Sequence, residues 1–290
     1  MNHSLRNTLL AVVATTGVAA GVGYFYFQKN DTPASTALLD ATSQSITTET
    51  LAPPLPSAAE SLTALFGIKA ITNQVANTPS QLSSIWFSQP FTQATRRFQV
   101  VFIKTQSLDP ESGTVLESHA DAATISAVVY QLENNHWQLF SKQINFGSFG
   151  SWGDVPKIDH TQTLQLSADQ LVFLIDSGFT GQGYTEEGKG LFSFNLQTKL
   201  WKELGFISTG GDNSGVCDET ISLTPDAMSL PCWQFSGEIT LAGKTDNSNY
   251  PNLLVTVKGT TNDDNNKIIP AINRLYVFKG DHYVENGLSE

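Results

Sequence analysis

The chain has 290 residues, of which 40% are hydrophobic and 15% are charged, and its formal net charge at pH 7 is −11. This hydrophobic content is enough for a sizeable core and excludes an intrinsically disordered chain. The acidic balance makes nucleic acid and anionic lipid headgroups poor partners, and it favours a cationic protein surface or a divalent cation.

The first predicted element is an apolar helix, Leu9–Phe27, which runs for 19 residues without a charge. Such a helix rises about 28 Å, the thickness of a bilayer's hydrocarbon core. We therefore expect a single transmembrane helix within residues 1–29, acting as a membrane anchor, with the rest of the chain exported. Small residues at Val18-Ala19-Ala20 leave an alternative open, in which a signal peptide is cleaved near Ala20 and the product is soluble.

Residues 30–56 are rich in Ser, Thr, Ala and Pro, which predicts a flexible linker. Residues 57–290 are expected to form one β-rich extracytoplasmic domain. At its start, Ser57–Ala76 places apolar residues on one helical side, and Ser57 with Glu60 forms a capping-box pattern. One short helix is therefore expected before the strands.

The pattern after Pro90 is typical of antiparallel β-structure. Three segments, AVVYQLENNHWQLF, LFSFNLQTKLWKEL and LYVFKGDHYV, each contain an alternating apolar strand, a short polar turn and a return strand that opens with an aromatic residue. Each follows a largely apolar segment that is typical of a buried strand: FQVVFIK, QLVFLID and NLLVTVK. We expect a mainly β fold, an antiparallel meander of hairpin units arranged as a propeller-like fold or as a two-sheet sandwich.

The chain contains two cysteines, Cys217 and Cys232, separated by a segment with little apolar material. Because an exported protein meets an oxidising compartment, we expect a structural disulfide between them. The spacing differs from the CxxC motif of redox-active pairs, and no basic residue flanks either sulfur.

Two metal sites are conceivable from the residue types. His119, Asp121 and His160 would provide zinc ligands for a hydrolase if the fold brought them together. Asp176 begins DSGFTGQGYTEEG, whose oxygen donors and glycines are typical of calcium-binding loops, although a long hairpin loop has the same composition.

Aromatic residues among glycines mark two further segments. FGSFGSWGD contains Phe149 and Trp152, and the segment just quoted contains Tyr184. Exposed aromatic rings beside free backbone donors suit contact with a partner protein or stacking on a sugar ring. The alternative is that these rings close the core at the ends of strands.

The series SHADAATISAVVY, INFGSFGSWGD, DSGFTGQGY and YPNLLVTVKGT resembles uncharacterised exported proteins of Gram-negative bacteria, over roughly Phe98–Val284. YPNLLVTVKG is also similar to the strand of FG-GAP-type propeller repeats, with Asn252 where an acidic calcium ligand is expected. Together with the predicted anchor, the resemblance implies a single-pass protein of the bacterial inner membrane with its C-terminal domain in the periplasm; cleavage near Ala20 would instead give a secreted or soluble periplasmic protein.

These observations favour a non-catalytic binding or interaction protein, with an inhibitor or immunity protein as one specific form. Its partner would be an envelope protein or a glycan. A metal-dependent envelope hydrolase and a glycan-binding module are the alternatives.

Overall fold

The computed structural model describes residues 53–118, 121–158, 161–217, 230–243, 250–263 and 266–286, which all belong to one compact unit, Leu51–Glu290. The predicted anchor at residues 1–29, the cleavage site near Ala20 and most of the predicted linker lie outside these residues. Over the part of the chain that is described, no helix has the length and apolar character needed to cross a membrane.

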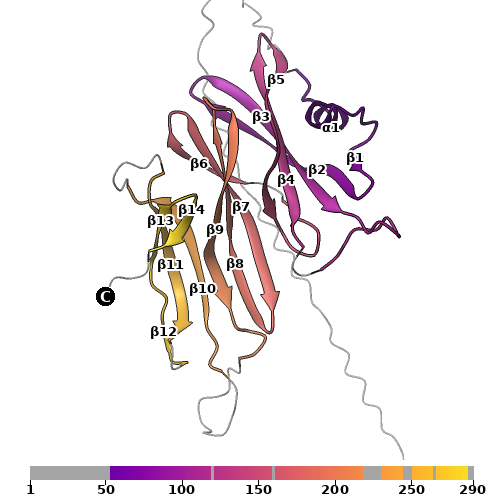
Figure 1. The fold of residues 1–290 in the computed structure, drawn as a ribbon. Coiled ribbons are helices and arrows are strands. Elements are labelled where there is room, and N and C mark those ends of the chain that lie inside the picture. The colour runs from indigo at the N-terminus through magenta and orange to yellow at the C-terminus, as the bar shows by residue number, and fades with distance from the viewer. Residues whose placement is uncertain are drawn as a thin grey trace, which may run out of the picture. The chain divides into compact units, whose positions relative to one another are not determined.

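The predicted antiparallel β fold with one short helix is confirmed (Figure 1). The elements in chain order are α1 (Ala58–Phe66), β1 (Gln74–Thr78), β2 (Gln81–Gln93), β3 (Arg96–Ser107), β4 (Ala123–Glu133), β5 (His136–Phe149), β6 (Gln162–Ser167), β7 (Gln170–Gly181), β8 (Tyr184–Asn195), β9 (Leu200–Asp212), β10 (Gln234–Leu241), β11 (Leu253–Asn262), β12 (Ile268–Pro270), β13 (Arg274–Lys279) and β14 (His282–Glu285).

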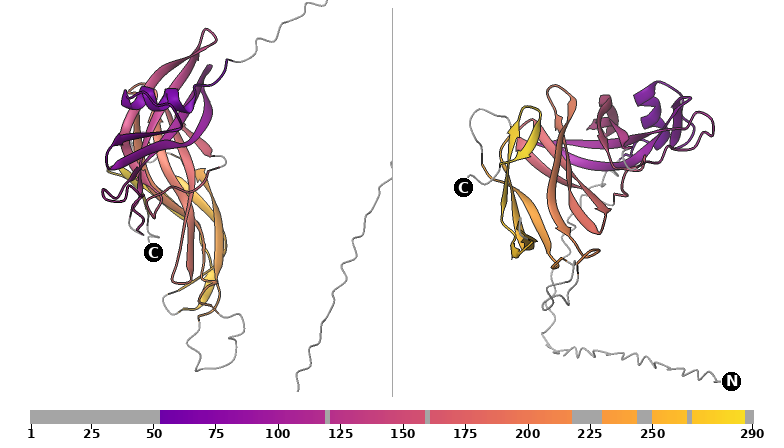
Figure 2. Two further views of the ribbon diagram at one scale, coloured as in Figure 1. Left: turned by 90° about the vertical axis from the view of Figure 1, so that its right-hand side faces the viewer. Right: turned by 60° about the horizontal axis from the view of Figure 1, so that its bottom comes forward.

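The strands form two sheets. One has five strands in the order β1-β2-β3-β4-β5, and the other has nine strands, with the path β14-β13-β11-β10-β9-β8-β7-β6 and β12 paired with β11. The larger sheet is curled like half a barrel, as two further views show (Figure 2). The predicted hairpins are β4–β5, β8–β9 and β13–β14.

The largely apolar segments are explained by burial on both faces of a strand. In β3, Val100 and Phe102 belong to a core between the two sheets, whereas Val101 and Ile103 belong to a core under α1. In β7 the same alternation places Phe173 between the sheets, while its neighbours Val172 and Leu174 fill the inside of the curled sheet. Because side chains alternate between faces, a strand covered on both faces must be apolar throughout.

Helix α1 begins as predicted and ends earlier than predicted. The Ser57 side chain accepts a hydrogen bond from the Glu60 main chain, and the Glu60 carboxylate accepts one from Ser57 N–H at 2.7 Å. These bonds hold the pKa of Glu60 below its usual value. The helix stops at Phe66 because Gly67 adopts a left-handed conformation with φ of 72°. The expected helical span to Ala76 was therefore too long.

The two sheets are also joined by side-chain to main-chain hydrogen bonds between β5 and β9. The amide of Gln143 accepts the Trp201 main-chain N–H at 2.6 Å and donates to the Trp201 carbonyl at 3.2 Å. Glu203 accepts the main-chain N–H of Ser148 at 3.1 Å. Gln143 thus provides hydrogen-bond partners for the main-chain N–H and carbonyl of Trp201 on β9, much as a neighbouring strand would.

Candidate binding groove

The β7–β8 hairpin contains the segment predicted to be a calcium-binding or long hairpin loop. Asp176–Gly181 and Tyr184–Gly188 are paired strand, and the turn consists of Gln182 and Gly183 alone, both with positive φ. Asp176 forms an ion pair with Lys189 on the neighbouring strand. In the structure its carboxylate therefore pairs across the hairpin and does not lie in a loop of oxygen donors.

The outer half of this hairpin carries an exposed aromatic face. The register between β7 and β8 is unbroken, so Phe179 and Glu186 project on the same face as the buried Phe173 and Phe192. Phe173 and Phe192 are covered by the smaller sheet. Phe179, in contrast, is 54% exposed, and Glu186 is exposed as well.

Glycines allow the aromatic rings on this face to lie close to the backbone. A Cβ added at Gly188 would come within 2.2 Å of Phe206 Cζ, and one at Gly181 within 2.5 Å of Phe179 Cζ. Both rings therefore rest on a position without a side chain, and this close approach requires glycine. Phe206 is nevertheless 41% exposed. Each ring therefore lies close to the main chain of the sheet and still remains about half exposed to solvent.

Two adjoining hollows lie over these rings, and we call them together the aromatic groove. The first, of about 460 Å³, is lined by the Gly150–Pro156 loop together with Ser177, Phe179, Glu186 and Phe206. The second, of about 430 Å³, shares Phe179 and Glu186 with the first and adds, among others, Tyr184, Ser208, Trp233, Phe235, Thr261 and Arg274. The groove thus combines aromatic side chains from β7, β8, β9 and β10 with a small number of polar groups.

The second hollow is built around a row of aromatic rings. The ring centroids of Tyr184 and Trp233 are 6.4 Å apart, and those of Trp233 and Phe235 are 6.0 Å apart in a stacked arrangement. The guanidinium carbon of Arg274 lies 4.6 Å from the centre of the Phe235 ring, within the range of a cation–π interaction.

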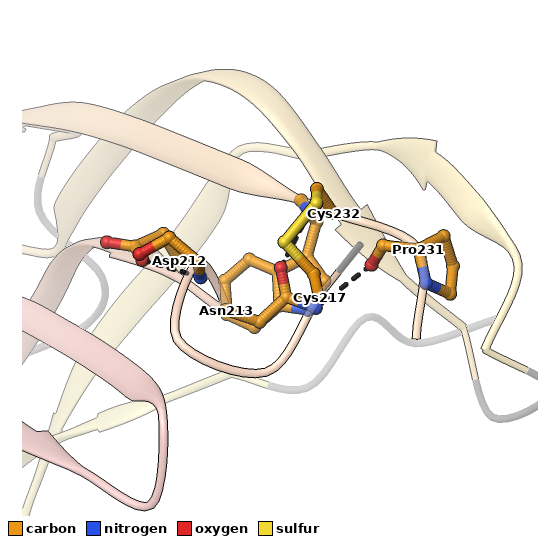
Figure 3. The surroundings of a disulfide bond; sticks show 7 residues. Asp212, Asn213, Cys217, Pro231 and Cys232 are labelled. Carbon is orange, nitrogen blue, oxygen red and sulfur yellow. Dashed lines mark hydrogen bonds between the residues drawn. A yellow bond between two sulfur atoms is a disulfide. The ribbon is translucent and has the colours of Figure 1, made fainter. Parts of the chain in front are cut away.

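Trp233 is held in place by the segment around the disulfide. Cys217 and Cys232 are joined, with their Cα atoms 4.9 Å apart, which is consistent with the predicted bridge (Figure 3). The fully buried Asn213 connects the same two segments. Its side-chain oxygen accepts the Trp233 main-chain N–H at 2.8 Å, and its side-chain nitrogen donates to the Pro231 carbonyl at 2.9 Å. The disulfide and Asn213 therefore fix the main chain on both sides of Cys232.

The predicted aromatic residues separate into two groups. Tyr184 lines the second hollow and is 41% exposed. Trp152 is 48% exposed and belongs to the loop that lines the first hollow, although its own side chain is not part of the lining. Phe149 is only 8% exposed and packs against Trp86 and Phe192, with ring centroids 5.4 and 5.6 Å away. It therefore belongs to the core, as the alternative interpretation had it, and we leave it out of the groove.

Of the predicted zinc ligands, His119 and His160 lie outside the described residues, and Asp121 lies within them. The main-chain oxygen of Asp121 accepts a hydrogen bond from Gly153 N–H at 2.8 Å, beside the Trp152 loop. Within the described ranges, no three His, Cys, Asp or Glu side chains lie close enough to hold a metal ion.

The charges in the groove are distributed unevenly. Asp154 of the first hollow is paired with Lys104, whereas the Glu186 carboxylate forms no hydrogen bond or ion pair with any described residue. Beside the second hollow, Ser214 donates two hydrogen bonds to Asp212, and these lower the pKa of that carboxyl. The charged side chains lining the first hollow are therefore acidic alone, whereas the second contains Arg274 beside the shared Glu186.

Several groove residues were not identified from the sequence: Phe179, Glu186, Phe206, Trp233 and Arg274. They come from four strands and from the residue before β10, and only the successive pairing of β7, β8, β9, β10, β11 and β13 places them together. The one sequence signal that could have pointed to this site is an aromatic residue, Phe179, two positions before a glycine, Gly181, in the same strand. No protein-family model, no curated protein and no solved structure matches this chain.

Proposed function

We propose that the chain is a non-catalytic binding protein of the bacterial periplasm, held at the inner membrane by residues 9–27, and that it engages another envelope protein through the aromatic groove. The observation that carries this proposal is the set of exposed aromatic rings held in fixed positions over glycines. Exposed rings such as Phe179 and Phe206 lower solubility and add little to the core, which suits a surface that becomes buried on binding.

The composition of the groove supports a protein partner. Interface cores are enriched in Tyr, Trp, Phe and Arg, and these residues contribute most of the binding energy when they lie in a pocket. The groove contains each of these residue types. Its rings are also restrained before binding, so little conformational entropy would be lost on association. An inhibitor or immunity protein that blocks an envelope enzyme is the specific form that fits best.

Affinity capture from envelope extract tests the proposal. The full chain should retain a stoichiometric partner, and the double variant Phe179→Ala, Trp233→Ala should lose it. A matched control is Leu200→Ala, since Leu200 is 57% exposed and lies outside the groove. Circular dichroism should show that all three proteins are folded. Equal capture by the double variant and the control would refute the groove as the contact surface.

A glycan is the second candidate occupant. Flat aromatic rings stack on sugar rings, and Ser177 and Ser208 place hydroxyl groups beside Phe179 and Phe206. Quenching of tryptophan fluorescence by neutral oligosaccharides, lost in the same double variant, would favour a glycan-binding module over a protein-binding one.

A further inference from the structure

We infer that the first hollow of the aromatic groove receives a cationic side chain, arginine or lysine, presented by a segment of a basic partner protein. The inference rests on the proposed function and specifies the chemistry of its partner. It follows from the contents of this hollow and from the contrast between the two hollows.

The first hollow contains the two features that bind a cation. Phe179 and Phe206 each have ring atoms close to a glycine of the sheet and a large exposed fraction, 54% and 41%. The π-face of an aromatic ring attracts Arg and Lys. Glu186 lies in the same hollow and provides a carboxylate that can accept a charge-assisted hydrogen bond.

One of the two carboxylates in this hollow, that of Glu186, has no cationic partner among the described residues. Among the described residues that line it, the charged ones are Asp154 and Glu186, and none is Lys or Arg. Lys104 neutralises Asp154, whereas no described residue pairs with Glu186. A cationic side chain would complete this arrangement, and the net charge of −11 would attract a basic partner from a distance.

The second hollow shows the same kind of contact already formed within the chain. Arg274 lies 4.6 Å from the centre of the Phe235 ring and occupies the position that a partner's cation would take there. The second hollow therefore contains Arg274 together with the shared Glu186, whereas the charged side chains that line the first are acidic alone. This difference favours the end formed by Phe179, Phe206 and Glu186 for the partner's cation.

The test uses the full chain and two dye-labelled peptides, one of alternating Arg and Ser and one with Gln in place of every Arg. Fluorescence anisotropy should show binding of the Arg peptide alone, weaker at high ionic strength. Glu186→Gln should lower the affinity about two- to fivefold, the range expected for an exposed ion pair. Glu187→Gln removes the same charge from the opposite face of β8 and should leave the affinity unchanged.

A second variant distinguishes a cation–π interaction with the Phe179 ring from a simple apolar contact. Phe179→Leu keeps an apolar side chain of similar size but removes the π-face, and it should lower the affinity for the Arg peptide by about two- to fivefold. Phe179 is 54% exposed, so the substitution leaves folding intact.

Three results would overturn the inference: no binding of the Arg peptide, equal binding of both peptides, or equal effects of Glu186→Gln and Glu187→Gln. Binding of a neutral oligosaccharide that excludes the Arg peptide would overturn it too, in favour of a sugar ligand. The proposed function fails separately, when capture of the envelope partner does not depend on Phe179 and Trp233.

Discussion

The Asn213→Ala substitution tests whether this side chain fixes the segment that carries Trp233. Asn213 is fully buried, and its amide makes one hydrogen bond to Trp233 at 2.8 Å and one to Pro231 at 2.9 Å. A buried hydrogen bond contributes about 1 kcal/mol, and a partner left unsatisfied costs about 1–3 kcal/mol. Because Trp233 and Pro231 are only partly buried, water can reach them, and the lower part of each range applies. We expect a loss of about 2–3 kcal/mol.

Urea unfolding followed by tryptophan fluorescence measures this loss, and Asn195→Ala is the matched control. The Asn195 side-chain oxygen also accepts two main-chain N–H groups, at 3.0 and 2.9 Å, but in an exposed turn. Its removal should cost about 1 kcal/mol or less. Asn213→Ala should in addition weaken capture of the envelope partner. Equal unfolding free energies for the two variants would refute the reasoning.

The remaining predictions concern stability. Gln143→Ala removes both side-chain hydrogen bonds to the main chain of Trp201 and should lower the free energy of unfolding by about 2 kcal/mol in urea titrations. Burial raises the pKa of Tyr283, so the folded state retains its proton at alkaline pH. The contribution of this phenol to the free energy of unfolding is complete below about pH 10 and is lost as the pH rises further. Tyr283→Phe should therefore make the alkaline fall in melting temperature shallower. Gly188→Ala brings a methyl group against Phe206 and should cost about 1–3 kcal/mol in thermal unfolding.

Each of these predictions has a control and a contradicting result. Gln138→Ala, an exposed position on the same strand as Gln143, should be nearly neutral, and equal losses would contradict the role given to the amide. An unchanged alkaline slope in Tyr283→Phe would show that the phenol does not govern the transition. Gly178→Ala, whose added Cβ would have its nearest contact at 3.1 Å, should lower the thermal stability less than Gly188→Ala does, and equal losses would contradict the role given to the Phe206 contact.

The sequence predicted those parts of the fold that depend on local patterns. The capping box at Ser57 and Glu60, the β4–β5, β8–β9 and β13–β14 hairpins, and the buried strands were recognisable because their signals lie within a few residues. The curl of the larger sheet was not predictable in this way. It depends on which strands pair over long distances, such as β10 with β9 through Gln234–Ser236.

The candidate site was predictable only in part, for a related physical reason. Tyr184 was identified because it stands among glycines, but the same pattern also selected Phe149, which lies at the end of β5 in the smaller sheet and is buried against Phe192 of the larger sheet. Local composition does not reveal which aromatic residues another layer will bury. Nor does it show that Phe206 lies over Gly188, since that contact depends on the register between β8 and β9.

The most direct test of the central claim is site-specific photocrosslinking in the cell envelope. A photoreactive phenylalanine analogue replaces Phe179 in one protein and Leu139 in another; Leu139 is 50% exposed and lies on β5, outside the groove. The account predicts a discrete covalent adduct with a second protein from position 179 and none from position 139. No adduct at position 179, or equal adducts at both positions, would contradict the assignment of the aromatic groove as a protein-binding surface.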